Sequence, residues 1–588
     1  MNLEPQLRQL EQTQLVRRLA EPDLAYAFKH VLIQEVAYES LLRQDRKQLH
    51  RSVGTTLETL FSDRLDEFAA LLAHHFMEGE EPAKAFRYYR LAGDAAASHF
   101  AHDEAILHYE RARSILGDLE TDRDSVGHVY RRLGRERELV GDYGKAQSVY
   151  QDLLDRAFRA GDERLELSAL LASATIHSTP TPFFDIEKGE AITQRALEIS
   201  HTLNDREAEA KVLWLRMLLL KFGNQPTEAV RVGEEAISLA RALGLKEQLA
   251  FALNDITGLY TGEGKVDMAL SAADEARALW TELGNLPMLT DILGNSTLIY
   301  GVMGESDKAL ALAEEAYQIS LSIENLWGRS FSRMFIGVIH IQRGHISQGL
   351  SIMRESIEYG ERAGFIAPQV YVRGWLGVAH AALGEVDEGI ALATLAGEKA
   401  AVGLPTWGWV ATVFLADIFA RTGNADEAAR LLEPLGADGI ESDPVRRSRV
   451  FYPIPLTRAR VELAQGAAQQ AIETCRSLNE FLIASRMVSF RAETLHLWGL
   501  ALQAVGDSDA ATQRWQEALS ISDRHENRLM GWEIHLDLSN SSSISPKQQE
   551  AHRRAARETA EYLAAHITEE RLRESFLRLP RVRQAISD

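Results

Sequence analysis

The fold is decided by Gly264-Lys-Val-Asp-Met-Ala269-Leu-Ser-Ala-Ala273-Asp-Glu-Ala276, a stretch that returns 40 residues later as Gly304-Glu-Ser-Asp-Lys-Ala309-Leu-Ala-Leu-Ala313-Glu-Glu-Ala316. In both copies a glycine precedes a small residue by five positions. Small residues then follow four and seven positions further on. Self-similarity at a fixed period is the sequence signature of a repeat protein.

The pattern extends along most of the chain. Each copy predicts two helices: the glycine ends the first in a left-handed conformation, and the small residues let the two helices approach closely. A second glycine or asparagine closes the second helix, at Asn204, Gly244, Gly284, Gly364 and Gly403. The small site recurs at steps of 39 to 43 residues, at Ala105, Ala146, Gly189, Ala229, Ala269, Ala309, Gly349, Gly389, Ala428, Ala471 and Ala511.

We therefore expect an all-α protein, a right-handed superhelical array of about eleven helix-turn-helix repeats of ~40 residues with helical caps at both ends. The first helices also carry the pairs Leu133-Gly134, Ile336-Gly337, Leu376-Gly377 and Trp498-Gly499. With the glycine pattern, these pairs resemble the tetratricopeptide repeat family over roughly residues 66–535. The unit is longer than the 34 residues of that family. A HEAT-type array is the structural alternative, and the Gly-x4-Ala core favours the tetratricopeptide interpretation.

The first 62 residues lack the repeat. They resemble the end of the winged-helix segment in bacterial signal-transduction ATPases of the STAND/AAA type, which are linked to nucleotide cyclases or LuxR-type regulators. The matching residues are Phe28, His30, Leu32, Ala37, Tyr38, Arg46, Leu49 and His50. The resemblance implies that the chain corresponds to the C-terminal sensor region of such a protein.

The C-terminal end also departs from the repeat. Residues 540–546 form a polar linker, in which Ser545 is a suitable N-cap and Pro546 a suitable first residue for a helix over 546–566. Residues 568–580 resemble the closing element of the same ATPase-linked proteins. We expect three parts: 1–62 as a mostly helical remnant of a winged-helix junction, 63–538 as the superhelix, and 539–588 as the linker and helical cap.

The composition excludes several classes of protein. The net charge of −21 disfavours direct binding to nucleic-acid phosphates, although it also serves simply to keep a long array in solution. No apolar stretch of 18 residues or N-terminal secretory signal is visible, so we expect no membrane span and a cytoplasmic location. The single cysteine, Cys475, occupies a repeat packing position, where we expect it to be buried and inert.

No catalytic motif is present. The sequence from Gly258 to Val266 approaches a phosphate-binding loop but has the wrong spacing and lacks the Ser or Thr that would hold Mg²⁺. The histidine clusters do not have the spacing of zinc ligands. We predict that the chain is not an enzyme and has neither a cofactor nor a metal site.

Repeat arrays of this kind bind partners on the concave face, which is lined by the first helices. The family's first-helix positions imply a row of aromatic, amide and basic side chains that suits a protein interface. Each of these residues is also a candidate for the packing core. The predicted row comprises Lys211, Trp214, Phe251, Asn254, Phe331, Arg333, Tyr371, Arg373, Trp375 and Trp409.

The leading hypothesis is a non-catalytic regulatory module that binds a protein, a peptide or a small effector. The alternative is the C-terminal fragment of an ATP-dependent nucleotide cyclase or transcriptional regulator whose catalytic domains are absent from this chain. In that case the chain alone should bind no nucleotide. A pure structural scaffold is the third possibility. The oligomeric state and the identity of the partner are not determined by the sequence.

Overall fold

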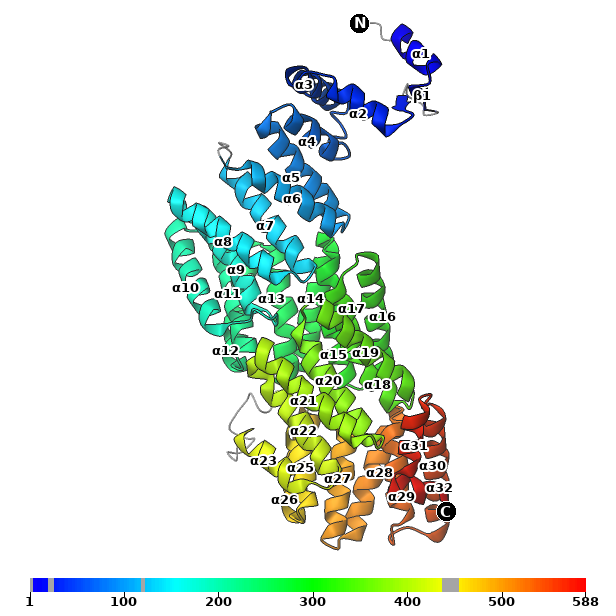
Figure 1. Cartoon of the computed structure of the whole chain (residues 1–588). Helices are drawn as coiled ribbons and strands as arrows, with labels where there is room; N and C mark the ends of the chain where they lie inside the picture. The colour runs from blue at the N-terminus through cyan, green and yellow to red at the C-terminus, as the bar shows by residue number, and fades with distance from the viewer. Residues whose placement is uncertain (1–3, 20–25, 118–121, 436–453, 588) are drawn as a thin grey trace. The chain divides into compact units, whose positions relative to one another are not determined.

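The computed structural model describes residues 4–19, 26–117, 122–435 and 454–587. Nearly all of them are helical (Figure 1). The described strands are β1 (Val16–Arg18) and β2 (Tyr26–Phe28), which form an antiparallel pair with Val16 opposite Phe28. The chain divides into two compact units, residues 1–136 and 137–588.

The first unit consists of the strand pair and helices of 9 to 18 residues. Its core forms where Phe76 stacks on Tyr88, whose hydroxyl donates to Glu58 at 2.5 Å. Tyr109 is fully buried and donates to Asp94 at 2.7 Å. The helices are α1 (Glu4–Gln12), α2 (Val31–Glu39), α3 (Arg43–Leu60), α4 (Ala69–Glu78), α5 (Pro82–Ser98), α6 (His102–Ile115) and α7 (Arg123–Leu139), which crosses the boundary between the units.

The second unit repeats one motif of two helices. We call the first helix of each pair the A helix and the second the B helix. The A helices are α9 (Glu163–Ser178), α11 (Arg206–Phe222), α13 (Lys246–Gly262), α15 (Leu286–Val302), α17 (Leu326–Met334) with α18 (Ile336–Gln342), α20 (Ile366–Ala382), α22 (Gly408–Arg421), α25 (Ile454–Ala464), α27 (Arg491–Ala504) and α29 (Arg528–Ser539). The B helices are α8 (Tyr143–Ala160), α10 (Ile186–Leu203), α12 (Pro226–Leu243), α14 (Val266–Leu283), α16 (Ser306–Ser322), α19 (Ile346–Arg362), α21 (Val386–Gly403), α23 (Ala425–Leu432), α26 (Ala468–Ala484), α28 (Ser508–Arg524) and α30 (Pro546–Ala565).

These helices confirm the predicted fold class. Among the described residues, the pairs that carry the predicted small sites run from α5–α6 to α27–α28 and number eleven. Two short 3₁₀ turns (Pro405–Trp407 and Glu433–Leu435) interrupt the series, and α31 (Glu570–Arg578) and α32 (Pro580–Ser587) follow it. Ser545 caps α30 through a reciprocal bond pattern with Gln548, which confirms the predicted helix start.

The predicted turn residues adopt the expected backbone conformation. Gly264, Gly304 and Gly344, each between an A and a B helix, have φ of +76°, +76° and +88°. Between B and A helices, Asn204 and Gly244 are also left-handed. Gly403 differs: it is the last helical residue of α21 and has no positive φ. A Cβ atom there would lie 2.6 Å from Ile366 Cδ1, so close packing explains this glycine.

Small residues bring the paired helices together, as predicted. A Cβ atom on Gly377 of α20 would lie 2.7 Å from the carbonyl oxygen of Gly389 on α21, and one on Gly389 would lie 2.6 Å from the oxygen of Gly377. Gly337 and Gly349 make the same contact between α18 and α19. The backbones of these pairs touch directly, which only glycine permits.

Turns that lie far apart in the sequence also meet within the second unit. The backbone N–H of Val488 donates to the carbonyl oxygen of Val302 at 2.7 Å. His525 Nδ1 lies 2.9 Å from the carbonyl oxygen of Gly304, and Thr568 N–H donates to Ser347 Oγ at 2.8 Å, both across 221 residues. The array therefore coils until one superhelical turn contacts the next. We call this line of contacts the seam.

Replacing Gly377 with alanine should lower the free energy of unfolding by about 1 to 3 kcal/mol, because the new methyl group would overlap the backbone of Gly389. Gly397→Ala on α21 is the matched control, since its nearest neighbour would be Ala411 Cβ at 3.7 Å. That variant should be neutral or gain up to about 1 kcal/mol from helix propensity. Urea unfolding followed by circular dichroism measures both, and equal stabilities would contradict the packing.

Candidate functional site

Most residues of the predicted binding row face neighbouring A helices. Trp214 and Asn254 are only 7% and 1% exposed, and Tyr371 is buried as well. Lys211, Phe251, Phe331, Trp375 and Trp409 are half-buried. The row is therefore largely enclosed by other A-helix side chains. Its role in partner binding stays a prediction.

Two members of the row point elsewhere. The Arg333 guanidinium lies over the Tyr317 ring at 3.7 Å, and Tyr317 belongs to the B helix α16. Arg373 is buried and donates to Glu361 on the B helix α19 at 2.8 Å. Each stands two residues after an aromatic side chain, Phe331 or Tyr371, and so projects from a different side of its helix. Both arginines contact B helices in addition to standing on A helices, and their role in partner binding stays a prediction.

The aromatic members form chains of ring contacts. The Trp214 and Phe251 centroids lie 4.7 Å apart, and Phe251 meets Trp280 at 4.8 Å. Further along, Phe331 contacts Phe365 at 5.9 Å, and the Phe365 ring stacks on Trp327 at 3.7 Å. These rings join consecutive repeats, so packing accounts for much of their contact area.

A polar cluster lies between these aromatic chains, on α11, α13 and α15. Asp255 accepts from Trp214 Nε1 at 2.8 Å, and Lys221 Nζ lies 3.4 Å from its carboxylate. Asp291 accepts from Asn254 Nδ2 at 2.7 Å. Asn295, one helical turn after Asp291, lies within 3.4 Å of the same oxygen. We call Lys221, Asn254, Asp255, Asp291 and Asn295 the Asp255–Asp291 cluster.

Two features of this cluster carry an energetic cost. Burial, together with the charge of Asp255, raises the pKa of Asp291 to about 6, although the Asn254 amide and Lys221 act in the opposite direction. Asn254 Oδ1 is buried and has no hydrogen-bond partner in the structure. An unsatisfied buried polar group and a carboxyl with a shifted pKa are together more typical of a functional site than of a packing core.

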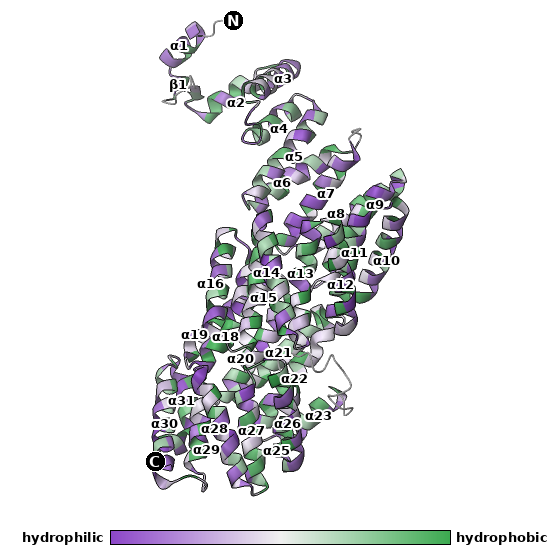
Figure 2. Cartoon of the chain, turned by 180° about the vertical axis from the view of Figure 1, so that it is seen from behind, coloured by the Kyte–Doolittle hydropathy of each residue, from purple (hydrophilic) through white to green (hydrophobic). Residues whose placement is uncertain are grey.

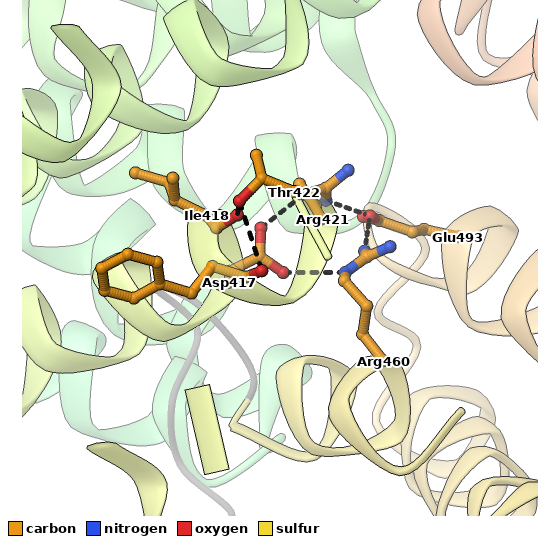
Figure 3. A network of polar contacts seen from close by, with 7 residues as sticks. Asp417, Ile418, Arg421, Thr422, Arg460 and Glu493 are labelled. Carbon is orange, nitrogen blue, oxygen red and sulfur yellow. Dashed lines mark hydrogen bonds and ion pairs between the residues drawn. The ribbon is translucent and has the colours of Figure 1, made fainter. Parts of the chain in front are cut away.

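A second cluster joins α22, α25 and α27 (Figure 3). Asp417 is fully buried and accepts from Arg421 Nε at 2.5 Å and from Arg460 Nε at 2.9 Å. Both guanidinium groups also bond to Glu493 Oε1, that of Arg421 at 2.5 Å. The charges alternate around this ring, so each carboxylate faces two arginines. We call these four residues the Arg–carboxylate ring.

The ring holds Glu493 in the charged form. Burial by itself would raise the pKa of Glu493, but Arg421 and Arg460 hold that pKa below its usual range. A carboxyl group whose pKa is lower in the folded protein than in the unfolded chain stabilises the folded protein at pH values above its ordinary pKa. That stabilisation is lost as the pH falls through the lowered pKa of the folded protein. The ring is therefore a structural clamp between three A helices at neutral pH.

Neither cluster was identified in the sequence, but a usable signal exists. Trp214 and Asp255 stand 41 residues apart, as do Asn254 and Asn295, and the bonded pair His496 and Asp537. Each separation is one residue longer than the 40-residue repeat, so the partners lie on consecutive A helices, one position out of register. Polar residues that recur one position beyond the repeat period on the A helices would have indicated the Asp255–Asp291 cluster.

Other candidates for chemistry are explained by the fold. Gly258 lies inside α13 and Gly264 forms the next turn, so the stretch that approaches a phosphate loop is part of a repeat. Cys475 is fully buried, as predicted, and burial raises the pKa of its thiol to about 12. Among the described His, Cys, Asp and Glu residues, no group of three is placed to hold a metal ion. No helix in the described part of the chain is long and apolar enough to cross a membrane.

Comparison with known proteins gives distant likenesses in structure. No family model and no curated protein matches the sequence. The chain is similar to the APC/C hetero-tetramer Cut9-Hcn1, with 14% identity and a TM-score of 0.29, over 85% of this chain and 96% of that chain. It is also similar to a Rap protein complexed with Competence and Sporulation Factor, with 11% identity and a TM-score of 0.34, over 76% of this chain and 99% of that chain. The fold class rests on the repeated helix pairs themselves.

Replacing Asp417 with asparagine should lower the free energy of unfolding by about 3 kcal/mol at pH 7, because two half-buried arginines lose part of their counter-charge. The matched control is Glu427→Gln, since Glu427 pairs with the well-exposed Arg430 within one helix. That change should cost less than about 0.5 kcal/mol. Chemical denaturation compares the two, and a similar small cost for both would show that the ring does not clamp the helices.

Proposed function

We propose that this chain is a non-catalytic interaction module, whose A-helix surface around the Asp255–Asp291 cluster binds a protein or peptide segment. The observation that carries the proposal is the unsatisfied Asn254 Oδ1 beside a carboxyl with a raised pKa. A side-chain amide donates to and accepts from a polypeptide backbone, which presents both N–H and C=O groups. The aromatic side chains on either side offer apolar contact area for the same segment.

The charge of the cluster favours a segment with a basic or amide side chain. Asp255 and Asp291 supply two carboxylates against the single ammonium group of Lys221. The acidic protein as a whole, with a net charge of −21, attracts the same kind of segment at long range. A small effector that carries an amine and an amide would satisfy the same groups. We place this binding in the cytoplasm, where a single buried cysteine stays reduced.

A library of displayed linear peptides, selected on the immobilised protein, tests the proposal. Peptides selected on the wild type should bind Asp255→Asn at least about tenfold more weakly, equivalent to about 1.4 kcal/mol. They should bind Asp274→Asn unchanged, because Asp274 is an exposed residue on the B helix α14. Calorimetry measures the affinities, and circular dichroism checks that each variant is folded.

Two results of this experiment would contradict the proposal. Selection of no peptide above background would argue against a peptide-binding surface. Peptides that bind Asp255→Asn as tightly as the wild type would place the binding surface away from the cluster.

A specific observation favours coupling to an ATPase or output domain, as the resemblance of residues 26–51 implies. None of the nine residues of α2 is buried, although four of them are valine, leucine or isoleucine (Figure 2). Val36 of α2 and the nearby Leu42, which precedes α3, are 68% and 73% exposed. An exposed apolar face of this kind is typical of a surface that docks on another domain. We propose that this face receives the regulated module.

The double substitution Val36→Ser with Leu42→Ser tests whether the face is free in this chain. The thermal midpoint should hardly change, since exposed positions contribute less than about 0.5 kcal/mol. Binding of a hydrophobic dye should fall. Leu72→Ser is the control, because Leu72 is fully buried in α4 and its loss should cost several kcal/mol. A midpoint that falls as far in the double variant as in the control would show that the face is already covered.

A further inference from the structure

The seam joins superhelical turns through residues in the turns between helices, at helix ends and on α31. Beyond the contacts of Val302, Gly304 and Ser347, Arg528 donates to the carbonyl oxygen of Arg343 at 2.9 Å. Arg571 donates to Glu385 at 2.6 Å, and Ser575 bonds to the same carboxylate. These contacts are hydrogen bonds and ion pairs between partly exposed groups. Such contacts exchange readily with water, unlike the apolar packing between A and B helices.

Histidines gather at one point of the seam. The His345 ring, in the turn after α18, lies 6.0 Å from the His340 ring and 6.0 Å from the His566 ring. His566 ends α30 and stacks on Tyr562 at 4.0 Å. The carbonyl oxygen of His566 accepts the backbone N–H of Ser347 at 3.2 Å. Three imidazoles therefore stand where two superhelical turns are held together.

The fixed charges around His345 come from two arginines and two acids. Arg343 lies on its own turn, and Arg528 at the start of α29 extends over the Tyr562 ring at 4.9 Å. Glu526 is the acid that faces this group, and it already pairs with Arg343 at 3.2 Å. Asp307 of α16 also pairs with Arg343, at 2.7 Å. The two acids therefore offset the charge of Arg343, and a proton on His345 is opposed mainly by His566 and Arg528.

We propose that the seam is a proton-sensitive latch, which opens when His345 and His340 take up protons. The turn at residues 343–347 then separates from residues 526–528 and 562–568, and the two superhelical turns part. Opening exposes side chains that the closed coil covers. The inference stands on the geometry of the seam and does not depend on the proposed peptide binding.

The pH dependence follows from the surroundings of the histidines. Burial, followed by the nearby cationic groups, lowers the pKa of His345 in the closed form, and burial lowers the pKa of His340 to about 4. The closed form therefore binds fewer protons than the open form. Closure is favoured above the ordinary histidine pKa of about 6.5 and is weakened as the pH falls below it.

Hydrogen–deuterium exchange on the full chain measures the latch directly. The reporter amides are those of Ser347 and Thr568, whose N–H groups cross the seam to His566 and Ser347. After correction for intrinsic exchange, their opening constant should rise about tenfold between pH 7.5 and 5.5, the increase expected for one histidine freed to its ordinary pKa. Amides in the middle of α20 should show no such rise.

Two variants and one control test whether the histidines of the seam cause the pH-dependent rise in the opening constant. His345→Gln and His566→Gln should each reduce the pH-dependent rise, and each tests the idea if the other fails to fold. His201→Gln, an exposed histidine on α10 outside the seam, should keep the full rise. The latch is refuted if the wild type shows no rise, if both seam variants keep it, or if the seam amides exchange only together with those of α20.

Discussion

The structure depends on a turn that must satisfy two conditions at one residue. Between an A and a B helix the chain reverses in a left-handed conformation, which favours glycine. At several of these turns the next superhelical turn also occupies the space of a side chain. A Cβ atom on Gly304 would lie 2.7 Å from the His525 ring, and one on Gly384 would lie 2.8 Å from the carbonyl oxygen of Ser575. At Gly423 and Gly466, which also lie between an A and a B helix, only the first condition holds, since a Cβ atom there would meet nothing within 4 Å.

One of these conditions is local and the other depends on the next superhelical turn. For this reason the helix pairs can be predicted from the sequence, whereas the contacts between superhelical turns cannot. Small sites spaced by about 40 residues reveal the helix pairs, because helix reversal and close packing are local demands on residues such as Gly377 and Gly389. The contacts across 221 residues, such as Thr568 with Ser347, depend on small rotations that accumulate over several repeats. No single repeat encodes that sum, so the sequence pattern predicts a superhelix without predicting which turns meet.

The candidate site was predictable only in part, for a related reason. The position of Trp214 on the A-helix side follows from the repeat. The contacts of Arg333 and Arg373 with B helices do not follow from it as directly, because a shift of two residues turns a side chain to another side of a helix. The Asp255–Asp291 cluster was missed, since Asp255 and Asp291 resemble the many carboxylates of solvated helix faces. Only their position relative to the repeat distinguishes them.

The two polar clusters on the A helices have different physical characters. In the Arg–carboxylate ring the acids face two arginines each, so the arrangement stabilises the stack. In the Asp255–Asp291 cluster two acids share one lysine, and Asn254 keeps an unused acceptor. The first arrangement is complete within the chain. We propose that a ligand completes the second, which is why the proposed binding surface is centred there.

Formation of a disulfide across the seam tests the coiled arrangement most directly. The hydroxyl oxygens of Ser347 and Thr568 lie 3.0 Å apart, so cysteines at these positions fall within reach of a disulfide bond. The variant S347C/T568C should form an intramolecular disulfide under mild oxidation. The variant D307C/T568C, in which the first cysteine is moved back by one repeat, should not. Equal cross-linking of the two variants, or none in S347C/T568C, would contradict the account.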